Sequence, residues 1–399
     1  MKPVGRLDPP PAWMAEPPVR QLLAALSRAG IAARFVGGCV RNTALGRPVE
    51  DIDIAVDKPP ETVARALEAA QIRVVPTGIR HGTLTAIVRG RPFELTTLRR
   101  DVETDGRRAV VAFTDDWLAD AERRDFTFNA LYADPDGTLY DPFDGRTDLS
   151  AGRVRFIGDA DTRIAEDRLR VLRFFRFHAW FGQPPLDAAG FDACRRNAAG
   201  VRSLSAERVA KELLRLLAAP APIDALEVMV EAGALDHWLP EYGGTARLRG
   251  LIVREERPDA LRRLAAVLPP TANATVIGKR LRLSTQDTLR LQVMLEPLPE
   301  EAGNLRVLLY RLGPTLFVDR LLLEGDALGD WRQGLALARS WTPPSLPVGG
   351  ADALKLGLKP GPEVGRLLET VERWWIDGDF QADRDACLAK LQQLAHDQA

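Results

Sequence analysis

The chain has 399 residues, of which 46% are hydrophobic and 27% are charged, and its formal net charge is −1. This length predicts two to four domains, at about 100–200 residues per domain. No apolar run approaches the roughly 18 residues that a membrane span needs, so we expect no membrane partner. Because the charge is close to neutral, any surface for nucleic acid must be local.

The cysteines and the N-terminal segment exclude further classes. Three widely separated cysteines without a Cys-x-x-Cys pair make a disulfide framework or a zinc site unexpected. The first residues mix acids with prolines and contain no apolar signal core, so we expect a cytoplasmic protein.

Up to about residue 155 the pattern alternates strands with helices. Helix signals lie at 61–70, and short β-rich stretches bounded by glycine or proline lie at 33–38, 51–56, 83–90 and 92–99. From Asp161 onward, apolar residues recur at three- and four-residue spacing, which is typical of helices. We therefore predict an α/β head with a mixed sheet (20–155), followed by all-helical segments at 156–220, 221–330 and 331–399.

Two aspartates are the first candidates for chemistry. In a strand over 51–56, Asp51 and Asp53 share one face while Ile52 and Ile54 point to the core. Two carboxylates on one face repel each other unless a cation lies between them, and Mg²⁺ prefers oxygen ligands. Alone, the pair could equally be surface aspartates on an edge strand. Glu94 lies in the predicted strand 92–99, and it is either a third carboxylate for the same metal or an ordinary surface glutamate.

A pair of glycines precedes these aspartates. Gly37 and Gly38 end a predicted strand and open a helix, which exposes backbone N–H groups suited to a triphosphate. Arg41, one turn further on, adds a cation. A Gly-Gly pair can be simple turn chemistry, but its combination with Asp-x-Asp in so short a segment favours a phosphate and metal site.

Three further motifs follow in order. In RRDFTFNAL (123–131), Arg123 and Arg124 are phosphate or ribose donors, and Asp125 can orient an arginine or hold a sugar hydroxyl. The phenylalanines are expected in the core. DPFDGRTDL (141–149) reads as a structured turn. EDRLRVLRFFRF (166–177) reads as part of one long helix that is capped by Asp161 or Thr162. Its polar face carries four residues at i, i+3, i+6 and i+9: Asp167, Arg170, Arg173 and Arg176.

These motifs, in this order, resemble the class II tRNA nucleotidyltransferases. That family contains the CCA-adding enzymes and the bacterial poly(A) polymerases, within the DNA polymerase β-like superfamily. The resemblance covers about residues 30–220, including LSAERVAKELLRLL (204–217), which is similar to a helix that supports the nucleotide pocket. It implies a head, neck, body and tail arrangement, with 331–399 as a tRNA-binding tail.

The resemblance also implies roles for individual residues. Asp51 and Asp53 would hold Mg²⁺, and the nucleotide would be bound by Gly38, Arg41, Arg124, Asp167, Arg170, Arg173 and Arg176. Glu94 stays a further candidate catalytic carboxylate on its residue type and position alone. One position departs from the family's usual pattern, because Asn42 follows Arg41 where an aspartate is usual. The substrates implied are tRNA, CTP and ATP. The region from Arg153 to Arg215, with thirteen Lys/Arg and eight Asp/Glu, is the expected local basic surface.

An Asp/Arg pair can choose between bases. Cytosine and adenine each present an amino donor beside an acceptor, which matches a carboxylate beside a guanidinium. Uracil and guanine reverse this polarity, so they would be rejected by repulsion as well as by lost attraction. The plain alternative for Asp167 and Arg170 is a surface ion pair on a helix.

The expected activity is addition of CCA to the 3′ end of tRNA. A poly(A) polymerase, an enzyme that adds only CC or only A, and a non-catalytic RNA-binding relative remain alternatives. The segment between Arg99 and Arg123 is long and charged, and in the family CC-only enzymes have a shortened loop here. We therefore expect the segment 102–109 to be needed for the terminal A.

Overall fold

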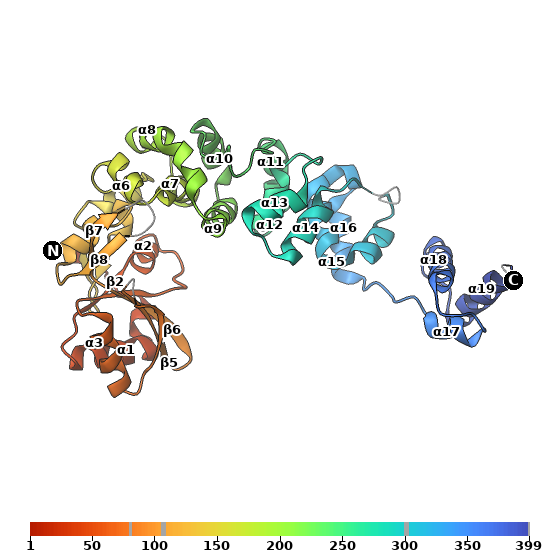
Figure 1. Cartoon of the computed structure of the whole chain (residues 1–399), viewed down its shortest axis with the longest axis horizontal. Helices are drawn as coiled ribbons and strands as arrows, with labels where there is room; N and C mark the ends of the chain where they lie inside the picture. Colours follow the sequence, from red (N-terminus) through yellow and green to blue (C-terminus); the bar gives the residue numbers. More distant parts are fainter. Residues whose placement is uncertain (80–81, 105–108, 299–302, 398–399) are drawn as a thin grey trace.

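The computed structural model describes residues 1–79, 82–104, 109–298 and 303–397. The chain forms an elongated arc with the N-terminal head at one end and the C-terminal helices at the other (Figure 1). No helix in the described ranges is both long and apolar enough to cross a membrane.

The head is built on one mixed sheet. Its described strands lie in the spatial order β1-β10-β9-β2-β3-β6-β5-β4. Their bounds are β1 Pro3–Arg6, β2 Ala33–Val36, β3 Asp53–Val56, β4 Arg73–Gly78, β5 Thr83–Val88, β6 Arg91–Thr97, β9 Tyr132–Ala133 and β10 Thr138–Tyr140. The pairing of β3 with β6 is parallel, with Asp53 opposite Glu94, whereas the other pairs are antiparallel. A separate hairpin joins β7 (Arg99–Thr104) to β8 (Ala109–Phe113).

Short helices surround this sheet. Their bounds are η1 Ala12–Ala15, α1 Pro17–Arg28, α2 Gly38–Ala44, α3 Pro60–Ala69, α4 Trp117–Glu122, η3 Thr127–Asn129 and α5 Gly145–Ser150. Helices α1 and α3 lie side by side (Figure 1) and pack on the sheet through Leu22, Leu26, Val63 and Leu67, all of which are buried. Every second residue of β5 is buried, which is the alternation expected of a strand with one face on a core.

The predicted head elements are confirmed, with two shifts near the glycines and aspartates. Strand β2 ends at Val36 because Gly37 has a positive φ of 68° and cannot continue the extended chain. Strand β3 begins at Asp53, so Asp51 precedes the strand and does not lie within it. The prediction of a loop between Arg99 and Arg123 is wrong, because this segment contains β7, β8 and α4.

The rest of the chain is helical, as predicted. The neck and body helices are α6 Ala160–Glu166, α7 Leu169–Phe181, α8 Ala188–Asn197, η4 Ala198–Ser203, α9 Ala206–Leu217, α10 Pro222–Glu231, α11 Ala246–Arg254, α12 Ala260–Ala266, α13 Ala274–Leu281, α14 Thr285–Leu295, α15 Leu305–Glu324, η6 Gly325–Leu328 and α16 Trp331–Ser340. The last helices are α17 Gly350–Lys355, α18 Pro362–Asp377 and α19 Arg384–His396.

The prediction of one long helix across 161–181 is wrong in one respect. The segment forms two helices, because Asp167 has extended backbone angles (φ −149°, ψ 105°) between α6 and α7. The predicted caps were also wrong: Asp159 caps α6, and its carboxylate accepts the backbone N–H of Thr162 at 2.8 Å. The break removes Asp167 from the helical ladder, while Arg170, Arg173 and Arg176 stay on α7.

One continuous core joins the end of the head to the neck and body. It runs from Phe126 and Phe128 through Phe174 and Leu213 to Leu322. The helices α17–α19 have a core of their own and stand apart in Figure 1. The domain boundaries at 155, 220 and 330 stay predictions.

Candidate active site

The turn between β2 and α2 forms part of the wall of the site. Gly37 has φ 68°, a conformation that L side chains rarely adopt, and its N–H donates to the carbonyl of Leu131 at 3.1 Å. Gly38 then begins α2 and lines a pocket of about 820 Å³. The turn therefore places both glycines in the pocket wall, whereas the predicted exposure of their backbone N–H groups to a triphosphate stays a prediction.

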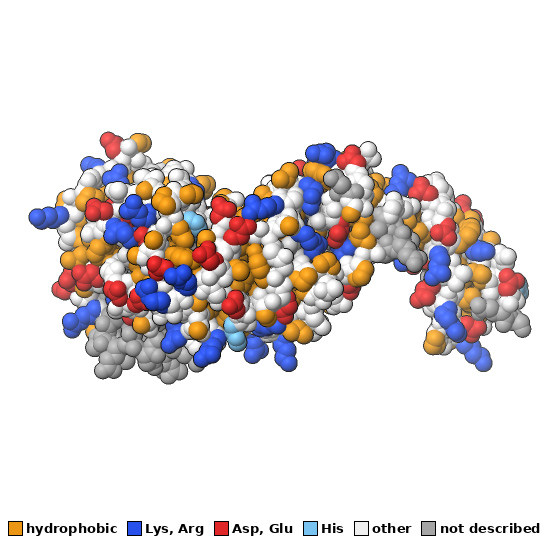
Figure 2. Space-filling model, turned by 90° about the horizontal axis from the view of Figure 1, so that it is seen from above, with side chains coloured by type: hydrophobic (Ala, Val, Ile, Leu, Met, Phe, Trp, Pro, Cys, Tyr) orange, Lys and Arg blue, Asp and Glu red, His pale blue; other side chains and the backbone are white. Residues whose placement is uncertain are grey.

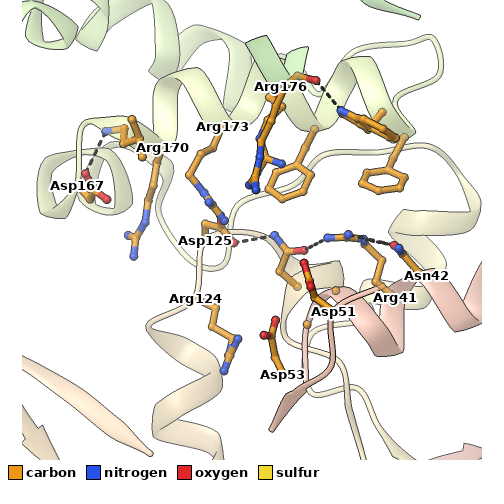
Figure 3. Close-up of a pocket in the computed structure, with 18 of the residues that line it drawn as sticks. Arg41, Asn42, Asp51, Asp53, Arg124, Asp125, Asp167, Arg170, Arg173 and Arg176 are labelled. Carbon is orange, nitrogen blue, oxygen red and sulfur yellow. Dashed lines mark hydrogen bonds and ion pairs between the residues drawn. The ribbon is translucent and has the colours of Figure 1, made fainter. Parts of the chain in front are cut away.

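The acidic side of the pocket is formed by Asp51 and Asp53, which both point into it (Figure 3). Burial of Asp53, together with the neighbouring charges of Glu94 and Asp51, raises the pKa of its carboxyl to about 6. Glu94 lies beside Asp53 in the parallel strand pair, outside the pocket lining. Among the described residues, no group of three acidic, histidine or cysteine side chains has the geometry of a metal cage. The third-ligand role of Glu94 therefore stays a prediction.

Arg124 is fixed in the pocket wall by two buried partners. Its Nε donates to the hydroxyl of Tyr132 at 2.9 Å, and its Nη2 donates to Asp120 at 3.0 Å. Burial alone would lower the pKa of Arg124, but these two partners raise it above its ordinary value. Asp120 is 1% exposed, and the guanidinium groups of Arg124 and Arg123 hold the pKa of its carboxyl well below its usual range despite burial. The guanidinium is thus permanently charged and oriented.

A chain of hydrogen bonds crosses the floor of the pocket (Figure 3). Arg173 donates to Asp125 at 2.6 Å, and Asp125 accepts from Nδ2 of Asn129 at 2.9 Å. Asn129 in turn accepts from Arg41 at 2.6 Å, and Arg41 also donates to the Oδ1 of Asn42 at 3.1 and 3.3 Å. Burial alone would raise the pKa of Asp125, but Arg173 and Asn129 lower it to about 2. This series of hydrogen bonds is therefore held by a carboxylate, that of Asp125, which stays ionised.

Asn42 leaves the positive charge of Arg41 without a neutralising acid at that position. Burial, and then the like charges of Arg176 and Arg173, lower the pKa of Arg41 to about 10. An asparagine preserves the acceptor for the guanidinium and adds no negative charge. The departure from the family pattern thus makes this part of the pocket more favourable to an anion.

Helix α7 supplies three arginines, and each has its own acidic partner. Arg170 contacts Glu166, and Arg176 contacts Glu212 of α9 at 2.5 Å. The third, Arg173, has Asp125 at 2.5 Å. The apolar residues of the same helix pack into the core, since Leu169, Leu172 and Phe175 are all buried.

Asp167 is not paired with Arg170. Its carboxylate accepts from Arg208 of α9 at 2.7 Å, and both side chains line the pocket. Figure 3 places Asp167 and Arg170 at one end of the pocket, Arg41 and Asn42 at the other, and the two aspartates between them. The pocket lining thus includes every sequence-predicted site residue except Glu94, which lies beside Asp53 on the neighbouring strand.

The motif at 141–149, whose second half begins helix α5, packs on η3 within the head. A Cβ on Gly145 would lie 2.4 Å from the carbonyl oxygen of Thr127, so only glycine fits there. The buried Asp148 accepts from the hydroxyl of Thr127 at 2.7 Å and from Nε of Arg155 at 2.8 Å. The structural interpretation of this motif is confirmed.

Sequence reasoning missed several residues that support the site. Glu166 and Glu212 hold arginines of α7, and Arg208 holds Asp167. The others are Asp120, Asn129 and Tyr132. One signal was available, because Asp120 precedes Arg123 and Arg124 by three and four residues, the spacing of helical ion pairs. Tyr132 and Glu212 meet their partners only through tertiary packing, which local spacing does not reveal.

Arginines outnumber acids in the pocket lining. On the face seen in Figure 2, by contrast, basic and acidic side chains are intermixed over the head, neck and body. The concentration of positive charge is therefore local, as the nearly neutral net charge required. Such a pocket favours a polyanionic ligand such as a nucleoside triphosphate.

Comparisons with known proteins agree with this geometry. Residues 33–155 match the poly A polymerase head domain, and residues 186–243 match the probable RNA and SrmB-binding site of polymerase A. The chain is 34% identical over 389 residues to the mitochondrial CCA tRNA nucleotidyltransferase 1 of Danio rerio, covering 90% of this chain and 87% of that protein. It is 32% identical over 396 residues to the CCA-adding enzyme of Levilactobacillus brevis, covering 93% and 96%.

A solved structure is similar over nearly the whole length. The crystal structure of the Bacillus stearothermophilus CCA-adding enzyme in complex with CTP superposes with a TM-score of 0.78 and 26% identity, covering 96% of this chain and 99% of that one. With the head, the pocket and these full-length similarities in agreement, the chain belongs to the family of class II CCA-adding tRNA nucleotidyltransferases.

Proposed function

We propose that this protein adds C, C and A to the 3′ end of tRNA, using CTP and ATP and a Mg²⁺-assisted nucleotidyl transfer. The observation that carries the proposal is the pair Asp51 and Asp53, which faces an arginine-lined pocket behind a Gly-Gly turn. The full-length relatives named above support the same activity, and one of them was solved with CTP. We assign the reaction to the cytoplasm.

The acidic pair fits a divalent cation. Burial, and then the crowding of the negative charges of Glu94 and Asp51 around it, raises the pKa of the Asp53 carboxyl to about 6. A cation with a preference for carboxylate oxygens relieves that crowding. Bound there, Mg²⁺ supplies the means to activate the RNA 3′-hydroxyl and to neutralise the triphosphate. Glu94 adds negative charge from the adjacent strand.

The chain's own residues bind and orient the triphosphate. Arg124 presents a guanidinium that Asp120 and Tyr132 hold in place, and Gly38, at the start of α2, lines the same pocket. Arg41, half-buried and held by Asn129 and Asn42, adds a second fixed donor. Positioned donors of this kind stabilise charge that develops on the phosphates without reorganising during the reaction.

Base choice is assigned to Asp167 and Arg170. Each is held by a different partner, Asp167 by Arg208 and Arg170 by Glu166, so both can present hydrogen-bonding atoms to one base edge. The carboxylate accepts the amino group of cytosine or adenine, and the guanidinium donates to the ring acceptor. The α17–α19 region is assigned to tRNA contacts outside the pocket.

The experiment that tests this function is incorporation into tRNA that lacks its 3′ CCA. The protein is supplied with labelled CTP alone, ATP alone, or both, and products are resolved at single-nucleotide length. We expect two C additions with CTP, one further A when ATP is present, and then a stop. A long ladder of A favours the poly(A) polymerase alternative, a stop after CC or a need for CC-ended tRNA favours a partial enzyme, and no incorporation contradicts the proposal.

A further inference from the structure

The pocket extends along the whole of α7. That helix has 13 residues, from Leu169 to Phe181. At a rise of about 1.5 Å per residue, the helix separates its two ends by roughly 18 Å. Asp167 and Arg170 lie at the first end, while Trp180 and Phe181 line the pocket at the second. No role has been assigned to Trp180 or Phe181, although the transfer reaction needs two substrates.

The second end has a fixed aromatic surface. The indole N–H of Trp180 donates to the carbonyl of Arg215 at 2.8 Å, and the Trp180 carbonyl accepts from Arg47 at 3.1 Å. Because its N–H is already bonded, what the indole offers to a ligand is its ring. Phe181 lies beside it at 6.5 Å between ring centroids, with the guanidinium groups of Arg41 and Arg47 at 4.5 and 4.9 Å from its centroid.

The charges at this end differ from those along the rest of the pocket. Arg124, Arg170 and Arg176 each have an acidic partner. Arg47 and Arg215 are exposed and line the same pocket, and within the part of the chain that the structure describes neither forms an ion pair with an acid. A rigid aromatic ring beside unneutralised arginines is the arrangement with which proteins bind single-stranded nucleic acid, by stacking and by phosphate contact.

We propose that Trp180 is the stacking platform for the 3′-terminal base of the tRNA and that Arg215 and Arg47 hold the adjoining phosphates. This assignment rests on the proposed function, since it places the acceptor at the end of the pocket opposite to the base-selecting pair. Figure 3 shows Asp51 and Asp53 between Asp167 at one end and Arg41, which lies over the Phe181 ring, at the other. The 3′-hydroxyl must meet the triphosphate at this midpoint. Trp180 is thus a positioning residue for the RNA and has no direct part in choosing C or A.

The test uses the full-length protein and an RNA minihelix with 2-aminopurine as its 3′-terminal base, in EDTA and without nucleotide. Stacking on an indole quenches 2-aminopurine, so wild-type protein should lower the fluorescence on binding. Trp180→Ala should abolish most of the quench and weaken minihelix binding about tenfold, the order observed for loss of one stacked base. Trp180→Phe should retain both, because it keeps a ring.

The charges are tested separately. Arg215→Ala should keep the quench but lower the salt dependence of binding by about 0.7 in the log–log slope, the value for one single-strand phosphate contact. Arg202→Ala, an exposed arginine outside the pocket, is the matched control and should change neither quantity. In steady-state incorporation, Trp180→Ala should raise the KM for the minihelix and leave the KM for CTP unchanged.

The opposite results would overturn the assignment. If Trp180→Ala keeps the wild-type quench and raises the KM for CTP instead, the aromatic end belongs to the incoming nucleotide. If Trp180→Ala fails to fold, it will show no activity with CTP either. In that case Arg215→Ala, which removes no packed ring, decides the question. Because the quench is measured without metal or nucleotide, it is independent of whether the wild type adds CCA.

Discussion

The carboxylate of Asp167 is bonded to the guanidinium of Arg208 at 2.7 Å, across the space between the start of α7 and the helix α9 that packs on it. Arg170, the partner expected from the sequence, is held by Glu166 and by the carbonyl of Arg123 at 2.8 Å. The two groups assigned to base reading are therefore supported independently. Removing one does not release the other, so their contributions can be measured one at a time.

The first prediction follows from this separation. Asp167→Ala should increase incorporation of UTP or GTP relative to CTP by about tenfold, since an unmatched buried polar group costs about 1–3 kcal/mol. Arg170→Ala should mainly lower incorporation of both correct nucleotides. The measurement is kcat/KM for each nucleotide on one minihelix. Unchanged selectivity in both variants would mean that the pocket reads bases elsewhere.

Arg208 supplies a graded version of the same test. Arg208→Ala leaves the Asp167 carboxylate in place but removes its 2.7 Å support. We expect a selectivity loss smaller than that of Asp167→Ala, because the repulsive acceptor remains and only its orientation is lost. A loss as large as that of Asp167→Ala would show that Arg208 itself contacts the base.

The acidic pair is tested by removing either member. Asp51→Ala and Asp53→Ala should each reduce incorporation by at least about 100-fold, the order of loss for a group that stabilises a transition state. The melting temperature should stay the same or rise slightly, because one of two repelling charges is gone. Asp115→Ala, an exposed acid elsewhere in the head, is the control. Near-normal activity in both variants would remove the proposed catalytic centre.

Asp120 should matter although it touches no substrate. Asp120→Asn weakens the hold on Arg123 and Arg124, and breaking such a buried pair costs about 3–5 kcal/mol. We therefore expect a lower melting temperature and weaker CTP binding by calorimetry. Tyr132→Phe, which removes one of the two supports of Arg124, should have a smaller effect. Asp136→Asn, an exposed acid on the surface, should change neither measurement, and equal effects of both Asp→Asn variants would contradict the role of Asp120.

We expect the hairpin of β7 and β8 to separate full from partial CCA addition. Deleting Val102–Ala109 removes the paired ends of both strands together with residues 105–108, which lie outside the described ranges. CC addition should remain, and addition of the terminal A should be lost, because a lever beside the pocket is shortened. The assay compares CC-ended tRNA with ATP against shorter tRNA with CTP. A deletion variant that completes CCA would show that the hairpin is not the switch.

Local sequence patterns predicted most of this site. The Gly-Gly turn, the aspartates and the arginines of α7 were all recognisable because each follows from spacing along one segment. What spacing could not predict is the partner of each charge: Glu212 meets Arg176 only because α9 packs on α7. The break at Asp167 was missed for a related reason. The apolar pattern continues through it, while Arg208 on a distant segment holds the irregular backbone in place.

Glu94 comes to lie beside Asp53 through strand register alone, with β4 and β5 between them in the chain. Side chains alternate along β6, so Phe93 and Leu95 are buried on the opposite face. A one-residue insertion within β6 ahead of Glu94 would turn the acid inward and a phenylalanine outward. An insertion of the same size in the connection between β4 and β5 would leave the ladder intact. The two insertions have the same length but should have opposite effects. The insertion in β6 should abolish the proposed catalytic centre, and the insertion between β4 and β5 should leave it unchanged.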